Sequence, residues 1–293
     1  MLFLQVFINS FVTSVQVLLL AAALYLIYMV SNIFHIAIAA IMLVSAYMFY
    51  ALNQIPVPFI YAFFIAIFSS ALIGMVSYLL LQDFAEKKMQ LPGLLVSIGL
   101  WLCLESIIAM IFGSDGKFLV DNVLKTFSFK SLYITQVGFW TLITGLLIVV
   151  VSYVFIQYLP TGRIIRAVKQ HSHCASIIGI KEKRVQLFVY FLSSLITGIV
   201  GLLIGLNNAI TPTSGTPLTI IAFIALLVGG VNNFKGVIIA TFILVIIPEL
   251  LISMNISGIN INSSWKMFII FILALSVLMV RPNGILSYKI RKT

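Results

Sequence analysis

Runs of about 20 apolar residues follow one another along almost the whole chain, and they constrain the fold more than any other feature. A helix of about 20 apolar residues is long enough to cross the hydrocarbon core of a bilayer. Charged residues make up only 8% of the chain, against about 25% in an ordinary soluble domain. The sequence therefore predicts an all-α protein, a polytopic bundle of transmembrane helices.

Nine spans are expected, within a range of about 8 to 10, in a single transmembrane domain over residues 1–293. They are residues 5–30, 33–52, 57–81, 92–112, 134–158, 187–207, 217–231, 237–254 and 265–281. Two are deficient: 217–231 is short, and 33–52 opens with the polar residues Ser31, Asn32 and His35. Short or interrupted spans in both halves of a membrane protein are typical of a substrate path near the bilayer midplane.

The first span is expected to be retained, because no Lys or Arg precedes it as in a cleavable signal peptide. Cys103 lies inside a span and Cys174 in a loop, so the two thiols are expected at different depths and unpaired.

The longest polar interruption, residues 160–185, carries six cations and one anion. An excess of cations is typical of a cytoplasmic loop. Read as a helix, the segment has a basic stripe with Arg166, Lys169 or Gln170, and His173. The other face, small and mildly apolar, is suited to docking a soluble partner; it carries Ile165, Val168, Ser172, Ala175 and Gly179. The alternative is a basic loop that serves only membrane topology and anionic headgroups.

The other cations agree with this orientation. The Lys87–Lys88 turn, Lys235 and the C-terminal tail with Arg281 are predicted to be cytoplasmic, and the N-terminus is predicted to be outside. Topology already explains the net charge of +10, so binding of nucleic acid is not expected.

Glu105 lies in the middle of a span, where a carboxylate costs about 2.5 to 3.5 kcal/mol on insertion scales. It is a candidate site residue, with a hydrogen-bonded tether between helices as the alternative. Glu249 follows Pro248 and is interpreted as a packing residue at a kink. The small residues Gly198, Gly201 and Gly205 predict close helix packing, either within the chain or between subunits.

Known catalytic patterns are missing from the sequence. His171, His173 and Cys174 have no second cluster at ligand spacing, so no metal site is expected. No phosphate-binding loop or nucleophile elbow occurs either. Directional transport by this chain would therefore need energy from a partner, and residues 160–185 are where the partner is expected to bind.

Several stretches resemble the permease subunits of branched-chain amino acid ABC importers. They are IGLWLCLESIIAMIFGSD (98–115), RAVKQHSHCASIIGI (166–180), ITPTSG (210–215), VGGVNNFKG (228–236) and RPNG (281–284). The resemblance implies a heterodimer with a second permease, two cytoplasmic ATPases that bind the ATP, and an extracytoplasmic solute-binding protein. It implies no cofactor on this chain and a location in the cytoplasmic membrane.

The resemblance also implies that the segment from Arg163 to Ile180 transmits the motion of the ATPases. The residues expected to couple are Arg163, Arg166, His173, Ala175 and Gly179. The residues expected to line the substrate path, chosen for their polarity at depth, are His35, Glu105, Asn207 and Thr216. The chain departs from the family pattern at His173-Cys174-Ala175 and at Ile38-Ala39, which leaves the solute open among amino acids and similar small polar molecules.

Three alternatives remain at this point. A permease of the related sugar or nucleoside importers would differ in the solute that its binding protein holds. A proton-coupled secondary carrier would use Glu105 as a relay. A membrane enzyme would act through the cluster from His171 to Cys174.

Overall fold

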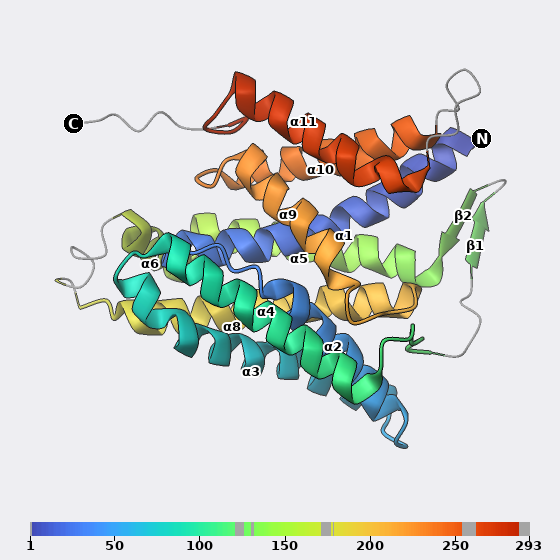
Figure 1. Cartoon of the computed structure of the whole chain (residues 1–293), viewed down its shortest axis with the longest axis horizontal. Helices are drawn as coiled ribbons and strands as arrows, with labels where there is room; N and C mark the ends of the chain where they lie inside the picture. Colours follow the sequence, from blue (N-terminus) through green and yellow to red (C-terminus); the bar gives the residue numbers. More distant parts are fainter. Residues whose placement is uncertain are drawn as a thin grey trace.

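The computed structural model describes residues 2–120, 126–129, 132–170, 177, 179–253 and 262–286. Each of the nine predicted spans coincides with an apolar helix, and the helices lie roughly along one direction (Figure 1). They are α1 (Leu2–Ser31), α2 (Ile38–Asn53), α3 (Phe59–Glu86), α4 (Gln90–Phe112), α5 (Gln136–Tyr158), α8 (Glu182–Asn207), α9 (Gly215–Gly229), α10 (Phe234–Ser253) and α11 (Lys266–Val280). Within the described residues, six are long and apolar enough to cross a membrane, and α2, α9 and α11 are shorter.

Helix α1 is the centre of the bundle. Its residues from Val17 to Ile27 are all buried, without the exposed polar face of a surface helix. Helices α5, α8, α9 and α10 pack on it from different sides. The hydrophobic core of the protein therefore surrounds α1.

Helix α8 packs against α1, α2 and α3, and its glycines allow the close approach. A Cβ atom on Gly198 would collide with Ser70 of α3, and one on Gly201 would collide with the carbonyl oxygen of Met42 in α2. Ser45 Oγ donates to the Gly198 carbonyl at 2.8 Å across the same contact. Gly205 lies against Leu119 instead. The predicted small-residue stripe thus packs within the chain, and the chain's own α2 and α3 occupy the face that a subunit interface would need.

The two deficient spans are short helices in the structure. Helix α9 has 15 residues, about 22 Å at 1.5 Å per residue, less than the roughly 30 Å of a hydrocarbon core. Helix α2 has 16 residues and begins only after an irregular segment over residues 32–37. Gly215, at the start of α9, lies against the backbone carbonyl of Ala39, at the start of α2. The N-termini of the two short helices therefore meet inside the bundle.

A β-hairpin was not predicted from the sequence. Strands β1 (Thr126–Phe129) and β2 (Leu132–Thr135) pair antiparallel in the connection between α4 and α5. Thr135 then caps α5, because its Oγ1 accepts from the amide of Gly138 at 3.0 Å. Nearby, Lys117 and Ile210 exchange two backbone hydrogen bonds of 2.9 and 2.8 Å, which join the segment after α4 to the segment before α9. A 3₁₀ turn, η1 (Ser263–Trp265), leads into α11.

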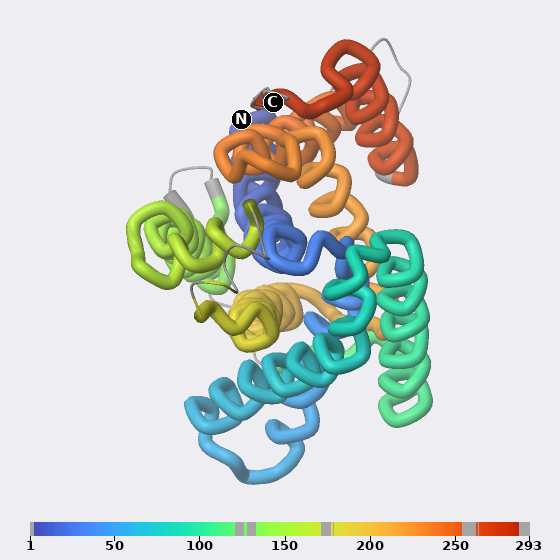
Figure 2. Tube along the Cα trace, turned by 90° about the vertical axis from the view of Figure 1, so that its left-hand side faces the viewer, coloured from blue at the N-terminus to red at the C-terminus, as the bar shows by residue number. Residues whose placement is uncertain are grey.

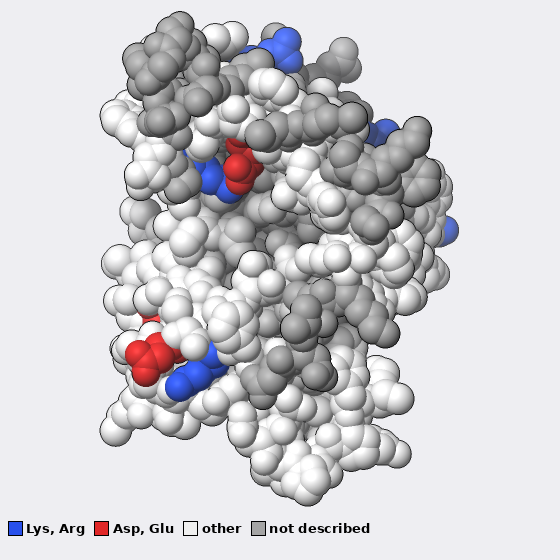
Figure 3. Space-filling model, turned by 90° about the vertical axis from the view of Figure 1, so that its right-hand side faces the viewer, with Lys and Arg blue, Asp and Glu red and all other residues white. Residues whose placement is uncertain are grey.

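Cations gather at the other end of the bundle, at the left of Figure 1, which we call the basic end. Here α3 and α11 finish, α8 starts, and α9 turns into α10; the polar helix α6 (Pro160–Gln170) lies here too. The described cations in these elements are Lys87, Lys88, Arg163, Arg166, Lys169, Lys181, Lys183, Arg184, Lys235 and Arg281. Among the residues described at the opposite end, charged side chains are few and of both signs (Figure 3). Helix α1 starts at that opposite end, and α11 finishes at the basic end.

Candidate functional site

Helix α6 is held against the bundle by its apolar face. Gly162, Ile165 and Val168 are buried, and α6 contacts α1, α5 and α8. The sequence-based interpretation of this face as a docking surface for a soluble partner is therefore wrong for Ile165 and Val168. They are 1% and 4% exposed, because burial against the chain's own helices removes them from water.

The basic stripe of α6 is partly accessible. Arg163 is exposed, whereas Arg166 is half-buried and donates from Nη1 to the backbone carbonyl and Oε1 of Gln157, both at 3.1 Å. Gly179 adopts φ = +86°, which favours glycine, in a turn before α8. His171, His173, Cys174 and Ala175 lie outside the described residues. Of the predicted coupling residues, the structure thus places Arg163, Arg166 and Gly179 at the basic end.

His35 lies in the irregular segment between α1 and α2 and is completely buried. Its Nε2 is 3.2 Å from Ser77 Oγ of α3, and its Nδ1 is 3.1 Å from Ser97 Oγ of α4. The Ser97 hydroxyl also accepts from the amide of Ala37 at 3.0 Å. The imidazole therefore joins the linker to two helices, and its role in lining a path stays a prediction.

Replacing His35 with alanine is expected to lower the free energy of unfolding by about 2 to 4 kcal/mol, because it leaves a cavity and removes one hydrogen bond from each of two buried hydroxyls. Thermal unfolding of the purified protein in detergent would measure the loss. Ser69→Ala is the matched control, since the Ser69 hydroxyl bonds only its own helix at Ala66, and a change below about 0.5 kcal/mol is expected. A His35→Ala protein that unfolds like the wild type but has lost transport would instead indicate a role in the path.

Glu105 borders a small cavity of about 250 Å³ between α4 and the segment before α9. The cavity is lined by Ser106, Ser114, Pro212 and Thr213 among others. The Glu105 side chain is half-buried, and its Oε2 is buried without a hydrogen-bond partner among the described residues. An unpaired buried carboxylate oxygen is costly, so it is suited to accept from a ligand that enters the cavity.

Thr216 borders a second and larger cavity, of about 480 Å³, one turn of α4 further along. Side chains of α4, α9 and α11 line it, with Ile36 from the segment before α2 and Ala39 from the start of α2. The lining is apolar apart from Thr216 and Thr219, whose Oγ1 is buried and unpartnered within the described residues. This cavity can hold an aliphatic group.

Asn207 ends α8 at the hairpin end, where its Oδ1 accepts from Thr135 Oγ1 at 2.9 Å. The structure thus brings Glu105 and Thr216 to successive cavities along α4, but it places His35 in the packed interior and Asn207 in a contact with the cap of α5. The four predicted path residues do not form one cluster.

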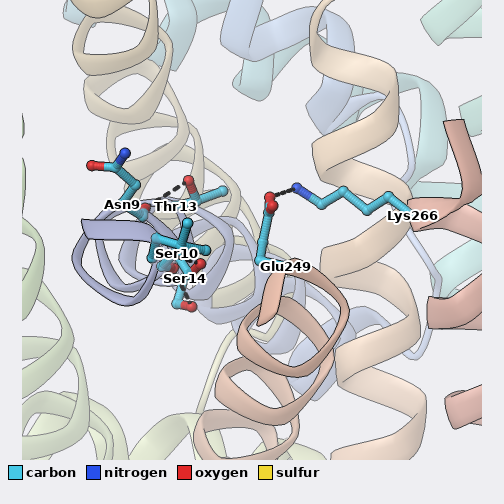
Figure 4. Close-up of polar contacts among 7 residues, drawn as sticks. Asn9, Ser10, Thr13, Ser14, Glu249 and Lys266 are labelled. Atoms are coloured by element: carbon cyan, nitrogen blue, oxygen red, sulfur yellow. Dashed lines mark hydrogen bonds and ion pairs between the residues drawn. The ribbon is translucent and has the colours of Figure 1, made fainter. Parts of the chain in front are cut away.

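Glu249 has a partner that sequence reasoning missed. It forms an ion pair with Lys266 at the start of α11, beside the N-terminal half of α1 (Figure 4). The α1 residues drawn there are Asn9, Ser10, Thr13 and Ser14, and the three hydroxyls donate to carbonyls of their own helix. The available signal was the single cation at the head of the last span. In the part of the chain that the structure describes, no group of His, Cys, Asp or Glu could hold a metal ion.

Residues 6–278 match the model of the family described as the branched-chain amino acid transport system permease component. One relative is a probable branched-chain amino acid transport permease, LivH, of Methanocaldococcus jannaschii, 23% identical over 94% of this chain and 90% of its own length. The high-affinity branched-chain amino acid permease LivH of Escherichia coli is 27% identical over 69% of this chain and 66% of its own length. The fructose import permease FrcC of Rhizobium meliloti is 23% identical over 51% of this chain and 43% of its own.

The solved structure of PsaBC from Streptococcus pneumoniae in complex with a Fab contains a chain with a similar fold. The TM-score is 0.50 at 13% identity, over 93% of this chain and 89% of that one. This likeness supports the helical-bundle fold and carries no information on substrate. The chain is a multi-pass membrane protein that belongs to the permease component family of branched-chain amino acid transport systems.

Proposed function

We propose that the chain is one of two membrane-spanning subunits of an ATP-driven importer that carries a branched-chain or similar aliphatic amino acid. The basic end faces the cytoplasm, because cations accumulate on that side of membrane proteins. The C-terminus is then cytoplasmic, and the hairpin end faces the solute-binding protein. The second permease and two ATPases complete the importer. ATP is bound by the ATPases, and this chain needs no cofactor of its own.

The position of α6 is the observation that carries the proposal. The helix lies at the basic end, exposes Arg163, buries Ile165, and packs against α1, α5 and α8. A displacement of α6 by an ATPase therefore reaches the central helix directly. Packed helices move as units rather than deform continuously, so such a push would bias the bundle between two arrangements. Gly179 and the segment that precedes it are the other residues through which we expect the ATPases to act on this chain.

The two cavities along α4 support an amino acid as the solute. The apolar cavity of about 480 Å³ suits a branched aliphatic side chain, and the unpaired Oε2 of Glu105 suits an ammonium group. The segment between Thr211 and Thr216 leads into the N-terminus of α9, which favours a carboxylate. We infer that Glu105 and Thr216 contact the solute during its passage.

The test is uptake into proteoliposomes that contain the importer assembled with its ATPases and binding protein. Labelled leucine is expected to accumulate only with ATP on the side of the basic end, and fructose is not expected to compete. Glu105→Gln is expected to raise the apparent KM about 10- to 100-fold, because a charge-assisted hydrogen bond of about 1.5 to 3 kcal/mol is lost. Glu86→Gln, which removes an exposed acid paired with Lys183 at 2.6 Å, serves as the matched control with unchanged KM.

Accumulation by the isolated chain under a proton gradient would contradict the proposal and favour a secondary carrier. ATP-driven uptake of a sugar in place of leucine would assign the chain to a sugar importer. Unchanged KM in the Glu105→Gln importer would remove Glu105 from the path and leave the ATP-driven function intact.

A further inference from the structure

A cavity of about 730 Å³ lies at the basic end, apart from the cavities along α4. Tyr25 and Met29 of α1 form its floor, the last turn of α5 and the end of α6 form two sides, and the turn between α9 and α10 forms another. Figure 2, which looks at this end, shows α5 and the α9–α10 pair on either side of α1. All these elements end or turn here, so the cavity lies at the depth where hydrocarbon gives way to headgroups.

Three cations face this cavity: Arg166 and Lys169 from α6, and Lys235 from the first turn of α10. None of the described residues that line it is Asp or Glu. Arg166 donates to Gln157, and Lys169 Nζ contacts the backbone carbonyl of Val231 at 3.5 Å. Positive charges from separate elements thus converge without a carboxylate to balance them.

The two lysines lie over aromatic rings instead of carboxylates. Lys169 Nζ is 5.6 Å from the centre of the Tyr25 ring, and Lys235 Nζ is 5.9 Å from that of Tyr153. Burial lowers the pKa of Lys169, as expected for an ammonium group without a counter-ion. Lys183, at the same end, shows the contrast, because it pairs with Glu86 at 2.6 Å. The basic end thus contains a carboxylate, that of Glu86, but no carboxylate is among the described residues that line the cavity.

The shape and lining of the cavity indicate the class of anion. A guanidinium and two ammonium groups suit the oxygens of a phosphate, and Asn232, Asn233 and Gln170 add further polar groups. Free phosphate would leave most of the volume unfilled. Met29, Ile156 and Phe234 supply an apolar wall that suits the glycerol and the first methylenes of a lipid. Basic pockets between helices on the cytoplasmic side are suited to anionic lipid headgroups.

We propose that the phosphate of an anionic phospholipid binds in this cavity between Arg166, Lys169 and Lys235. The bound headgroup fixes the end of α6 to α1, α5 and the α9–α10 turn. The site is independent of the solute carried, because it shares no lining residue with the cavities along α4.

The test is native mass spectrometry of the delipidated full-length chain titrated with phosphatidylglycerol, with phosphatidylcholine as the zwitterionic lipid and inorganic phosphate as the free anion. One phosphatidylglycerol is expected to bind in preference to phosphatidylcholine. The triple substitution R166Q/K169Q/K235Q is expected to weaken it roughly one hundredfold, since each cation near an anionic headgroup contributes about fivefold. The matched control is K87Q/K88Q/K181Q, which removes three exposed cations of the same end from positions outside the cavity. It is expected to bind like the wild type.

Equal weakening in both triple variants would overturn the proposal, because it would indicate general attraction to the basic end. Full competition by inorganic phosphate would replace the lipid by a free anion as the ligand. Absence of bound phosphatidylglycerol from the assembled importer, with crosslinks from position 235 to a partner subunit, would assign the cavity to an acidic protein segment. Should the triple variant fail to fold, the single substitution Lys235→Gln at an exposed position carries the test, with about a fivefold loss expected.

Discussion

Replacing Gly201 with alanine is expected to destabilise the bundle by about 3 kcal/mol, whereas the same replacement at Gly99 is expected to stabilise it by up to about 1 kcal/mol. The Cβ atom of the new alanine at position 201 would collide with the Met42 carbonyl and lie 2.6 Å from Ser45 Oγ. Helices α2 and α8 would have to separate, with the loss of the bond from Ser45 to Gly198. At Gly99, on α4, the added atom meets nothing within 4 Å, so only the better helix propensity of alanine remains.

Unfolding of the two purified variants in a titration with a denaturing detergent would measure both effects. The opposite signs make the comparison independent of the detergent chosen. Equal stabilities of the two variants would show that α2 and α8 are not in the close contact described.

Ile165→Asp is expected to reduce ATP-driven uptake more than tenfold while the protein remains in the membrane. Ile165 is 1% exposed at the contact of α6 with α1, α5 and α8, and an unpaired carboxylate there costs several kcal/mol. Because α6 is short and lies at the end of the bundle, the expected response is local: α6 detaches from α1, α5 and α8, and trypsin cleaves faster at Arg163 and Arg166. Uptake assays together with limited proteolysis measure both.

Ile165→Val is the matched variant at the same position. It removes one methylene, at a cost of about 0.5 to 1.5 kcal/mol, and is expected to retain most of the uptake. If aspartate and valine at position 165 give the same uptake, the anchoring of α6 does not transmit the motion. If aspartate abolishes insertion altogether, faster cleavage cannot be observed, and the role of Ile165 is in folding rather than coupling.

The helices and the basic end follow from local properties of the sequence. The apolar runs predict each helix because length and hydropathy are read within one segment, and the cations of residues 160–185 predict α6 and its location for the same reason. The short helices α2 and α9 were also predictable, since polar residues and glycines interrupt their spans.

Contacts between distant segments were not predictable in the same way. His35 was chosen for its polarity at depth, but its surroundings depend on Ser77 and Ser97, which lie 42 and 62 residues away. The apolar face of α6 resembles a docking surface until α1, α5 and α8 are placed against it. The partner of Glu249 and the pairing of β1 with β2 likewise arise from contacts that hydropathy does not encode.

The central position of α1 affects how the protein is inserted into the membrane during synthesis. It is surrounded in the finished protein by α5, α8, α9 and α10, all of which leave the ribosome later. For a time it must therefore reside in the membrane beside lipid or the insertion apparatus. The hydroxyls of Ser10 and Ser14 donate to carbonyls of their own helix at 2.7 Å. Neither hydroxyl therefore needs a hydrogen-bond acceptor on another helix before the later helices are inserted. The serines of the central helix therefore carry satisfied hydroxyls before any other helix of the bundle has been inserted.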